Sequence, residues 1–233
     1  MLYAKKLTHI SDAVTDVNLP VFSEKYVKDI NDFKKVFESN FNKIFVLIIF
    51  SAMSAIFWAK DIIYVLIGSN KYDLAIPLLA PMVFTFVFYS IINILESSIA
   101  IPAKLVKDII LGFLLMLGVT IGTYLAGKTL APPLYIMSYS MLAGTIMGFF
   151  YLVFILQKRL NFKFINHSHF LILIQGLVIS YGGYLENIWV KGSLYILYCL
   201  LFVWGVFVSE FISKKQVKYL VSKSFEKVRL FIK

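Results

Sequence analysis

Charged residues are scarce in this chain. Asp, Glu, Lys and Arg make up 15% of its 233 residues, whereas a soluble domain contains about 25%. Hydrophobic residues make up 60% of the chain, and the mean hydropathy is +0.81. This balance excludes an ordinary soluble domain. Because long runs are apolar on all sides, it predicts an all-α integral membrane protein.

Cysteine and catalytic motifs are also lacking. Cys199 is the only cysteine, so the chain cannot form an intrachain disulfide. We find no glycine-rich phosphate loop, no nucleophile with a base and no metal-ligand spacing, so we expect neither an enzyme nor a bound cofactor or metal. His167 and His169 lie two residues apart in a basic loop. Paired metal ligands and a solvated loop are both open interpretations of these histidines.

Six apolar runs follow a polar N-terminal part. A helix that crosses a bilayer needs about 20 mostly apolar residues, and we therefore expect six transmembrane helices within residues 44–211. The runs cover residues 44–68, 75–95, 109–126, 134–156, 170–185 and 194–209.

Amphipathic segments flank these runs. In the second half of residues 1–43, lysines alternate with apolar residues three or four positions apart, namely Tyr26, Ile30, Phe33, Phe37 and Phe41. The pattern predicts a helix on the membrane surface, with a helix packed on the protein's own loops as the alternative. Residues 212–233 are also basic and amphipathic, which predicts a C-terminal helix on the anionic inner leaflet.

Lysine and arginine are unevenly divided between the two sides of the expected bundle. Nineteen of the 23 fall on the side that holds both chain ends, and Lys71, Lys128 and Lys191 fall on the other. Lys60 lies within the first apolar run. By the positive-inside rule, this distribution predicts a multi-pass protein of the cell membrane with both termini cytoplasmic.

Three charged residues lie within or at the edge of apolar runs. They are Lys60 and Asp61 in the first run and Glu96 after the second. Such charges usually face a bundle interior or a water-filled cavity, although all three could instead reach an interface by snorkelling. Tyr89 and Asn93 share the helical face of Glu96. This predicts a polar stripe for sugar hydroxyls or, alternatively, for hydrogen bonds between helices.

Two pairs of glycines have the spacing that allows helices to approach closely. Gly118 and Gly122 lie in the third run, and Gly144 and Gly148 lie in the fourth. The spacing predicts close packing between these two helices.

Three short motifs in the first third of the chain carry a resemblance. They are Tyr3-Ala4-x-x-Leu7, Leu19-Pro20-Val-Phe-Ser23 and Ile-Gly68-Ser-Asn-Lys-Tyr72-Asp-Leu-Ala75. Together with the order of elements, they resemble the polysaccharide flippase branch of the multidrug/oligosaccharidyl-lipid/polysaccharide exporter superfamily. The resemblance implies the second lobe of a transporter that moves lipid-linked oligosaccharides by alternating access. It also implies a partner, either a first lobe or a second chain, and a cavity-lining helix within residues 1–20.

On this resemblance we expect Lys60, with Asp61 as its partner, to hold a pyrophosphate or an acidic sugar. Tyr89, Asn93 and Glu96 are expected to contact sugar or to gate the cytoplasmic side. The expected partners are membrane lipids and a lipid-linked glycan, without nucleic acid. The alternatives are a non-transporting scaffold subunit and a multidrug or ion exporter of the same superfamily. An excess of lysine over carboxylate disfavours the exporter.

Overall fold

The computed structural model describes residues 20–67, 76–180, 183, 185, 187–208 and 211. In this part of the chain, all regular structure is helical. The expected cavity-lining helix in residues 1–20 and the expected basic helix in residues 212–233 lie outside the described residues, apart from Pro20. Residues 20–28 are helical. The elements that follow are α3 (Ile30–Phe57), α4 (Ala59–Ile67), α5 (Ile76–Leu95), the π-helix η2 (Glu96–Ala100), α6 (Val106–Gly127), α7 (Pro133–Leu160), α8 (His167–Ser180) and α9 (Ile188–Val208).

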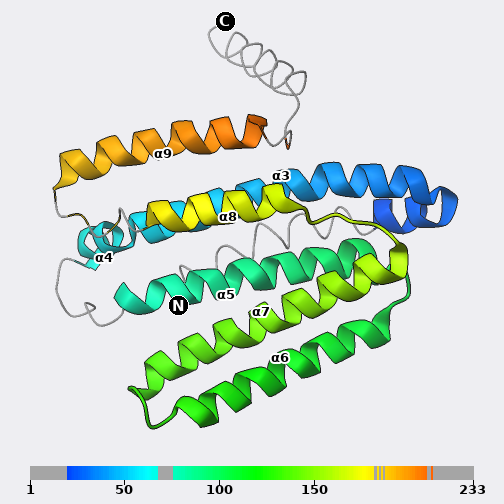
Figure 1. Cartoon of the computed structure of the whole chain (residues 1–233), viewed down its shortest axis with the longest axis horizontal. Coiled ribbons are helices and arrows are strands. Elements are labelled where there is room, and N and C mark those ends of the chain that lie inside the picture. The colour runs from blue at the N-terminus through cyan, green and yellow to red at the C-terminus, as the bar shows by residue number, and fades with distance from the viewer. Residues whose placement is uncertain are drawn as a thin grey trace, which may run out of the picture.

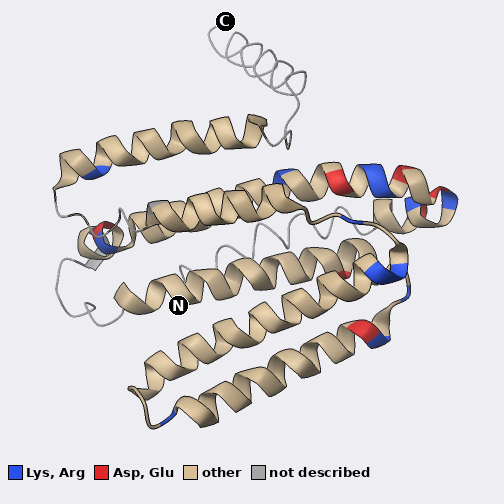
Figure 2. Cartoon of the chain, viewed as in Figure 1, with Lys and Arg blue, Asp and Glu red and all other residues tan. Residues whose placement is uncertain are grey.

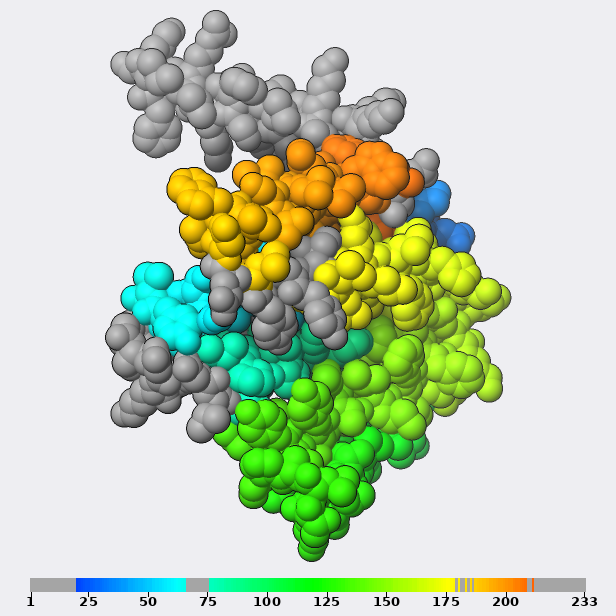
Figure 3. All heavy atoms as spheres, turned by 60° about the vertical axis from the view of Figure 1, so that its left-hand side comes forward, coloured from blue at the N-terminus to red at the C-terminus, as the bar shows by residue number. Residues whose placement is uncertain are grey.

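The long helices run side by side and alternate in direction along the chain (Figure 1). Packing contacts join them in the order α9, α8, α3, α5, α7 and α6, so the molecule is a row of helices with α9 and α6 at its two edges. Figure 3 shows α9 and α6 at the two edges from another side. The short helix α4 does not join this row. It is seen nearly end-on in Figure 1 and therefore crosses the direction of α3.

Five of these helices are long and apolar enough to cross a membrane: α3, α5 with η2, α6, α7 and α9. Six spans, the number that the sequence predicts, are not confirmed within the described residues, because the fifth apolar run has no helix of spanning length there. Its helix, α8, has 14 residues and is about 21 Å long, against a hydrocarbon core of about 30 Å. The described part of the chain is thus an all-α protein of the multi-pass membrane type.

The first long helix differs from the prediction at both of its ends. It begins at Ile30, where the carboxylate of Asp29 accepts hydrogen bonds from the amides of Asn31 and Asp32 at 2.8 and 3.4 Å, which is an N-cap. It then continues without interruption to Phe57, so the amphipathic residues before 43 and the apolar residues after it form one helix. The expected helix over residues 44–68 is instead broken at Trp58.

The phenylalanine stripe at the start of α3 is packed inside the protein. Phe33, Phe37 and Phe41 are each no more than 1% exposed. Their rings lie 5.5–6.2 Å apart along the helix and contact Phe22 and Phe164 from neighbouring segments. These rings therefore contact the protein's own segments rather than a membrane surface, as in the alternative interpretation of the pattern.

Close packing between α6 and α7 involves only one of the two glycine pairs. A Cβ atom on Gly144 would lie 2.6 Å from the carbonyl oxygen of Met116, and one on Gly148 would lie 3.2 Å from the Cβ of Met116. Gly118 and Gly122 meet nothing within 4 Å. Gly144 and Gly148 of α7 therefore face α6, while Gly118 and Gly122 of α6 face away from α7.

Charged residues gather toward the two ends of the row and leave an apolar band between them (Figure 2). Lys60, Lys128 and Lys191 lie at one end, which we call the lysine-poor end. The other described Lys and Arg residues lie toward the opposite end. This two-ended distribution is typical of a protein whose middle lies in hydrocarbon.

Candidate functional site

The candidate site is built around the break between α3 and α4. Trp58 leaves the helical conformation with φ −96° and ψ 7°, and the chain then changes direction. The break carries Lys60 and Asp61 onto α4, at the lysine-poor end of the row. Neither residue therefore lies within a continuous apolar span, which removes most of the cost of placing a charge in hydrocarbon.

Asp61 forms an ion pair with Lys191 of α9, and not with its sequence neighbour Lys60. The Lys191 side chain is 1% exposed, whereas that of Asp61 is 35% exposed. The Lys191 ammonium also donates to the carbonyl of Gly183 at 2.9 Å. It lies 5.5 and 5.2 Å from the ring centres of Phe57 and Trp58, within the range of cation–π attraction. The buried charge is thus compensated on several sides, as a buried lysine requires.

Gly183 can reach Lys191 because it has no side chain. A Cβ atom at this position would lie 2.6 Å from the carbonyl oxygen of Phe57, which is closer than atoms in a stable structure approach. The absence of a Cβ therefore lets the 183 backbone pack directly on the end of α3 and present its carbonyl to the ammonium.

Sequence reasoning missed Lys191, which it assigned to an external loop. The structure places it in the first turn of α9, because the helix begins at Ile188. Asn187 caps this start, since its side-chain oxygen accepts from the amides of Trp189 and Val190 at 3.0 and 3.3 Å. An Asn just before an apolar run is a recognised start signal, and it would have placed Lys191 inside the helix.

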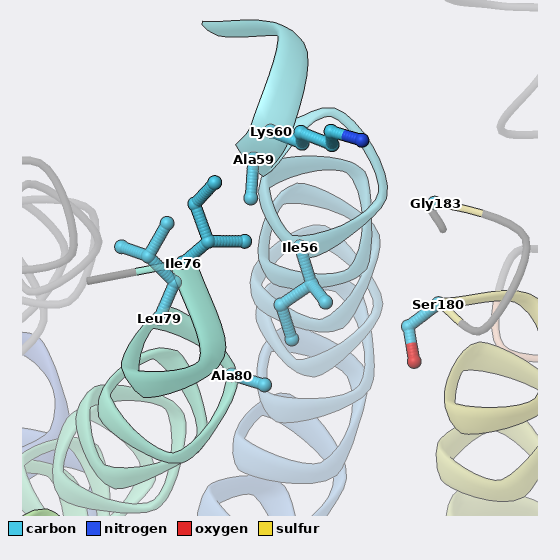
Figure 4. Close-up of a pocket in the computed structure, with 8 residues that line it drawn as sticks. All are labelled: Ile56, Ala59, Lys60, Ile76, Leu79, Ala80, Ser180 and Gly183. Carbon is cyan, nitrogen blue, oxygen red and sulfur yellow. The ribbon is translucent and has the colours of Figure 1, made fainter. Parts of the chain in front are cut away.

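Lys60 lies on another side of the same break. Its side chain extends toward Gly183 and borders a small cavity between α3, α5 and the end of α8 (Figure 4). The cavity measures about 20 Å³, which is room for about one water molecule. Among the described residues, Lys60 makes no ion pair, and its ammonium lies 5.9 Å from the ring centre of Tyr64. Its charge is therefore available to an anion.

An open groove borders Trp58 and Asp61. It has a volume of about 550 Å³, which lies in the range of ligand-binding cavities. Its lining combines an indole, a carboxylate, two hydroxyls and aliphatic side chains, contributed by Ser51, Ser54, Ala55, Trp58, Asp61, Ile62 and Val65.

The predicted polar stripe lies at the opposite end of α5. Tyr89 is 40% exposed, Asn93 and Glu96 are partly buried, and Glu96 opens the π-helix η2. About 20 residues of helix, or about 30 Å, separate Glu96 from the start of α5 beside Lys60. The structure therefore divides the predicted site residues into two groups, one at each end of the row.

His169 is buried at the start of α8, and His167 is exposed. The ring of His169 contacts the side-chain oxygens of Asn166 and Asn42 at 2.7 and 3.1 Å. Within the described residues, no group of three or more His, Cys, Asp or Glu residues could hold a metal ion. His169 thus links α8 to α3 through polar contacts.

Burial lowers the pKa of His169 from 6.5 to about 4, which makes stability depend on pH. Between these two values the unfolded chain binds a proton that the folded chain does not bind. We expect the free energy of unfolding to have its full value above pH 6.5 and to fall as the pH drops toward 4. Thermal unfolding in detergent at pH 7 and pH 5 measures this loss.

His169→Gln should remove this part of the pH dependence, and the exposed control His167→Gln should keep it. Equal pH dependence in the two variants would show that another group is responsible.

Comparisons of the chain with protein-family models, with curated proteins and with solved structures find no match. The fold and the charged site at the end of the row of helices therefore define only the class of the protein. It is an α-helical protein of the multi-pass membrane type.

Proposed function

We propose that this chain acts in the transbilayer movement of a lipid-linked oligosaccharide, as the second lobe of a flippase in the cell membrane. The observation that carries the proposal is the charged cluster at the break between α3 and α4, where Lys60 is free of ion pairs among the described residues beside a carboxylate and an open groove. Charged residues of membrane proteins that face a cavity often mark a substrate path, and Lys60 borders a cavity at the end of α3. The three sequence motifs that resemble polysaccharide flippases support the same function.

In this proposal Lys60 binds the pyrophosphate of the lipid carrier. Asp61 does not neutralise Lys60, because Asp61 is occupied by Lys191. Tyr89, Asn93 and Glu96 contact the glycan or control access at the opposite, lysine-rich end. We place that end, with both termini, on the cytoplasmic side, following the positive-inside rule. A hydrophilic glycan would then pass between the two groups while its lipid tail stays in the bilayer.

The test is a lipid-translocation assay with the whole chain reconstituted in vesicles. A fluorescent polyprenyl pyrophosphoryl oligosaccharide is incorporated in both leaflets, and an impermeant reductant then bleaches the outer leaflet. We expect bleaching to continue beyond the outer-leaflet fraction in vesicles that contain the chain. Bleaching that stops at that fraction, as in protein-free vesicles, would contradict translocation by copies of this chain alone and favour either a lobe that needs a first lobe or a scaffold subunit.

Lys60→Gln should weaken binding of polyprenyl pyrophosphate by about 10- to 150-fold, because a charge-assisted hydrogen bond contributes about 1.5–3 kcal/mol. Thermal stability should be unchanged, since Lys60 makes no ion pair within the described residues. Native mass spectrometry of the chain with this lipid gives the affinity.

The matched control is Lys128→Gln, which removes an exposed lysine at the same end of the row. If both substitutions weaken binding equally, the effect comes from general surface charge and not from Lys60.

A further inference from the structure

The groove beside Trp58 is not used by the role proposed for Lys60. It extends from Asp61, at the lysine-poor end, along the last two turns of α3 to Ser51. A hydrophilic ligand beside Trp58 and Asp61 lies at the end of the apolar helix and not at its middle. Its lining provides an aromatic ring together with hydroxyl and carboxylate oxygens, the combination that a sugar ring with one apolar face and several hydroxyls requires.

The charges on the wall of this groove compensate each other. Asp61 is partly exposed, and its partner Lys191 is buried behind it. A ligand in the groove meets one paired carboxylate, and none of the described residues that line the groove is a lysine or an arginine. An anionic ligand would be repelled by Asp61, so the arrangement selects an uncharged polar ligand.

Hydrogen-bonding capacity remains on the wall. Within the described residues, Oδ1 of Asp61 and the hydroxyl of Ser51 make no hydrogen bond. The hydroxyl of Ser54 accepts one from Tyr195 at 2.8 Å and keeps its own proton to donate. These groups can accept from and donate to the hydroxyls of a ligand.

The Trp58 ring is held in place before any ligand arrives. Phe57 and Tyr195 contact it edge-on, with ring centres 5.3 and 5.5 Å away, and the Lys191 ammonium lies 5.2 Å from its centre. A preorganised aromatic ring loses little conformational entropy when it binds a ligand.

We infer that this groove binds a neutral hexose unit, stacked on Trp58 and hydrogen-bonded to Asp61 and Ser54. The inference rests on the proposed function, because the hexose is the first sugar of the glycan whose carrier pyrophosphate Lys60 is proposed to bind. It goes beyond that function in naming a separate sugar site and its preference for an uncharged sugar.

The experiment compares three carriers on the whole chain in nanodiscs by native mass spectrometry: bare polyprenyl pyrophosphate, the same lipid with one neutral hexose, and the same lipid with one hexuronic acid. We expect the hexose to improve affinity by about five- to tenfold, the effect of one good aromatic contact with its hydrogen bonds. The hexuronic acid should improve it less. Trp58→Ala should abolish the gain, and Trp58→Phe should keep most of it.

The matched control is Trp189→Ala, which removes a tryptophan that is 83% exposed at the same end of the row and should keep the full gain. Equal affinity for the bare and hexose-bearing carriers would overturn the sugar site, and so would a gain that survives Trp58→Ala. In both cases the role of Lys60 stands if the bare carrier still binds and Lys60→Gln weakens it. Failure of all three carriers to bind would overturn both the sugar site and the proposed function.

Discussion

Asp61→Asn should lower the free energy of unfolding by about 3 kcal/mol, because it leaves the Lys191 ammonium buried without its counter-charge. Removing one partner of a buried ion pair costs about 3–5 kcal/mol, and we take the lower figure because Asp61 is 35% exposed. The carbonyl of Gly183 and the two aromatic rings remain near the ammonium, but none of them carries a full negative charge. Unfolding of the purified chain in mixed micelles, followed by helical circular dichroism, measures the effect.

Removing both charges should cost much less than removing one. Replacement of a whole buried ion pair by apolar residues of similar size is often neutral or stabilising. We therefore expect Asp61→Leu combined with Lys191→Met to be more stable than Asp61→Asn alone. Lys60→Met is the matched control, since this lysine makes no ion pair among the described residues. If the double variant is as unstable as Asp61→Asn, the loss of stability does not come from leaving Lys191 without its counter-charge.

The helices of the middle of the chain could be predicted from sequence. Residues 75–95, 109–126 and 134–156 correspond closely to α5, α6 and α7, because each is a long apolar run bounded by polar, proline or glycine residues. Pro133, for example, stands at the first position of α7, where its missing amide costs nothing. In these runs, local composition alone is enough to define the helix.

The two ends of the bundle could not be predicted in the same way. No proline or glycine lies at the break at Trp58, and apolar residues continue on both sides of it. The ordinary causes of a sharp kink are therefore absent from the sequence. Residues 170–185, which we expected to form one span, include Gly182 and Gly183 just after Ser180, so the sequence did contain a helix-stop signal at the end of α8.

The candidate site was predicted only in part. Asp61 stood out because it is a charge in an apolar run, but its partner Lys191 lies 130 residues away in the sequence. No local pattern joins the two, because the ion pair depends on α9 lying beside the end of α3. The glycine pairs show a similar limit: their spacing predicts a smooth helical face but not which helix that face meets.

Gly144→Ala should weaken the packing of α6 against α7 and lower the free energy of unfolding by about 1–3 kcal/mol, the usual cost of overpacking. The new methyl group would lie 2.0 Å from Oγ1 of Thr120 and 2.6 Å from the carbonyl oxygen of Met116. Rotation of Thr120 relieves the first clash but not the second, which involves backbone. Thermal unfolding in detergent measures the loss, and Thr120→Ala should restore only a part of it.

Gly118→Ala and Gly122→Ala are the matched controls, because a methyl group at either position meets nothing within 4 Å. Both should leave the stability of the chain unchanged in detergent. If Gly118→Ala were as destabilising as Gly144→Ala, the orientation of α6 described here would be wrong. If Gly118→Ala left stability intact but prevented the chain from assembling with another membrane protein, α6 would be an interface. That result would support the interpretation of the chain as a scaffold subunit. The exposed face of α6 does not support it by itself.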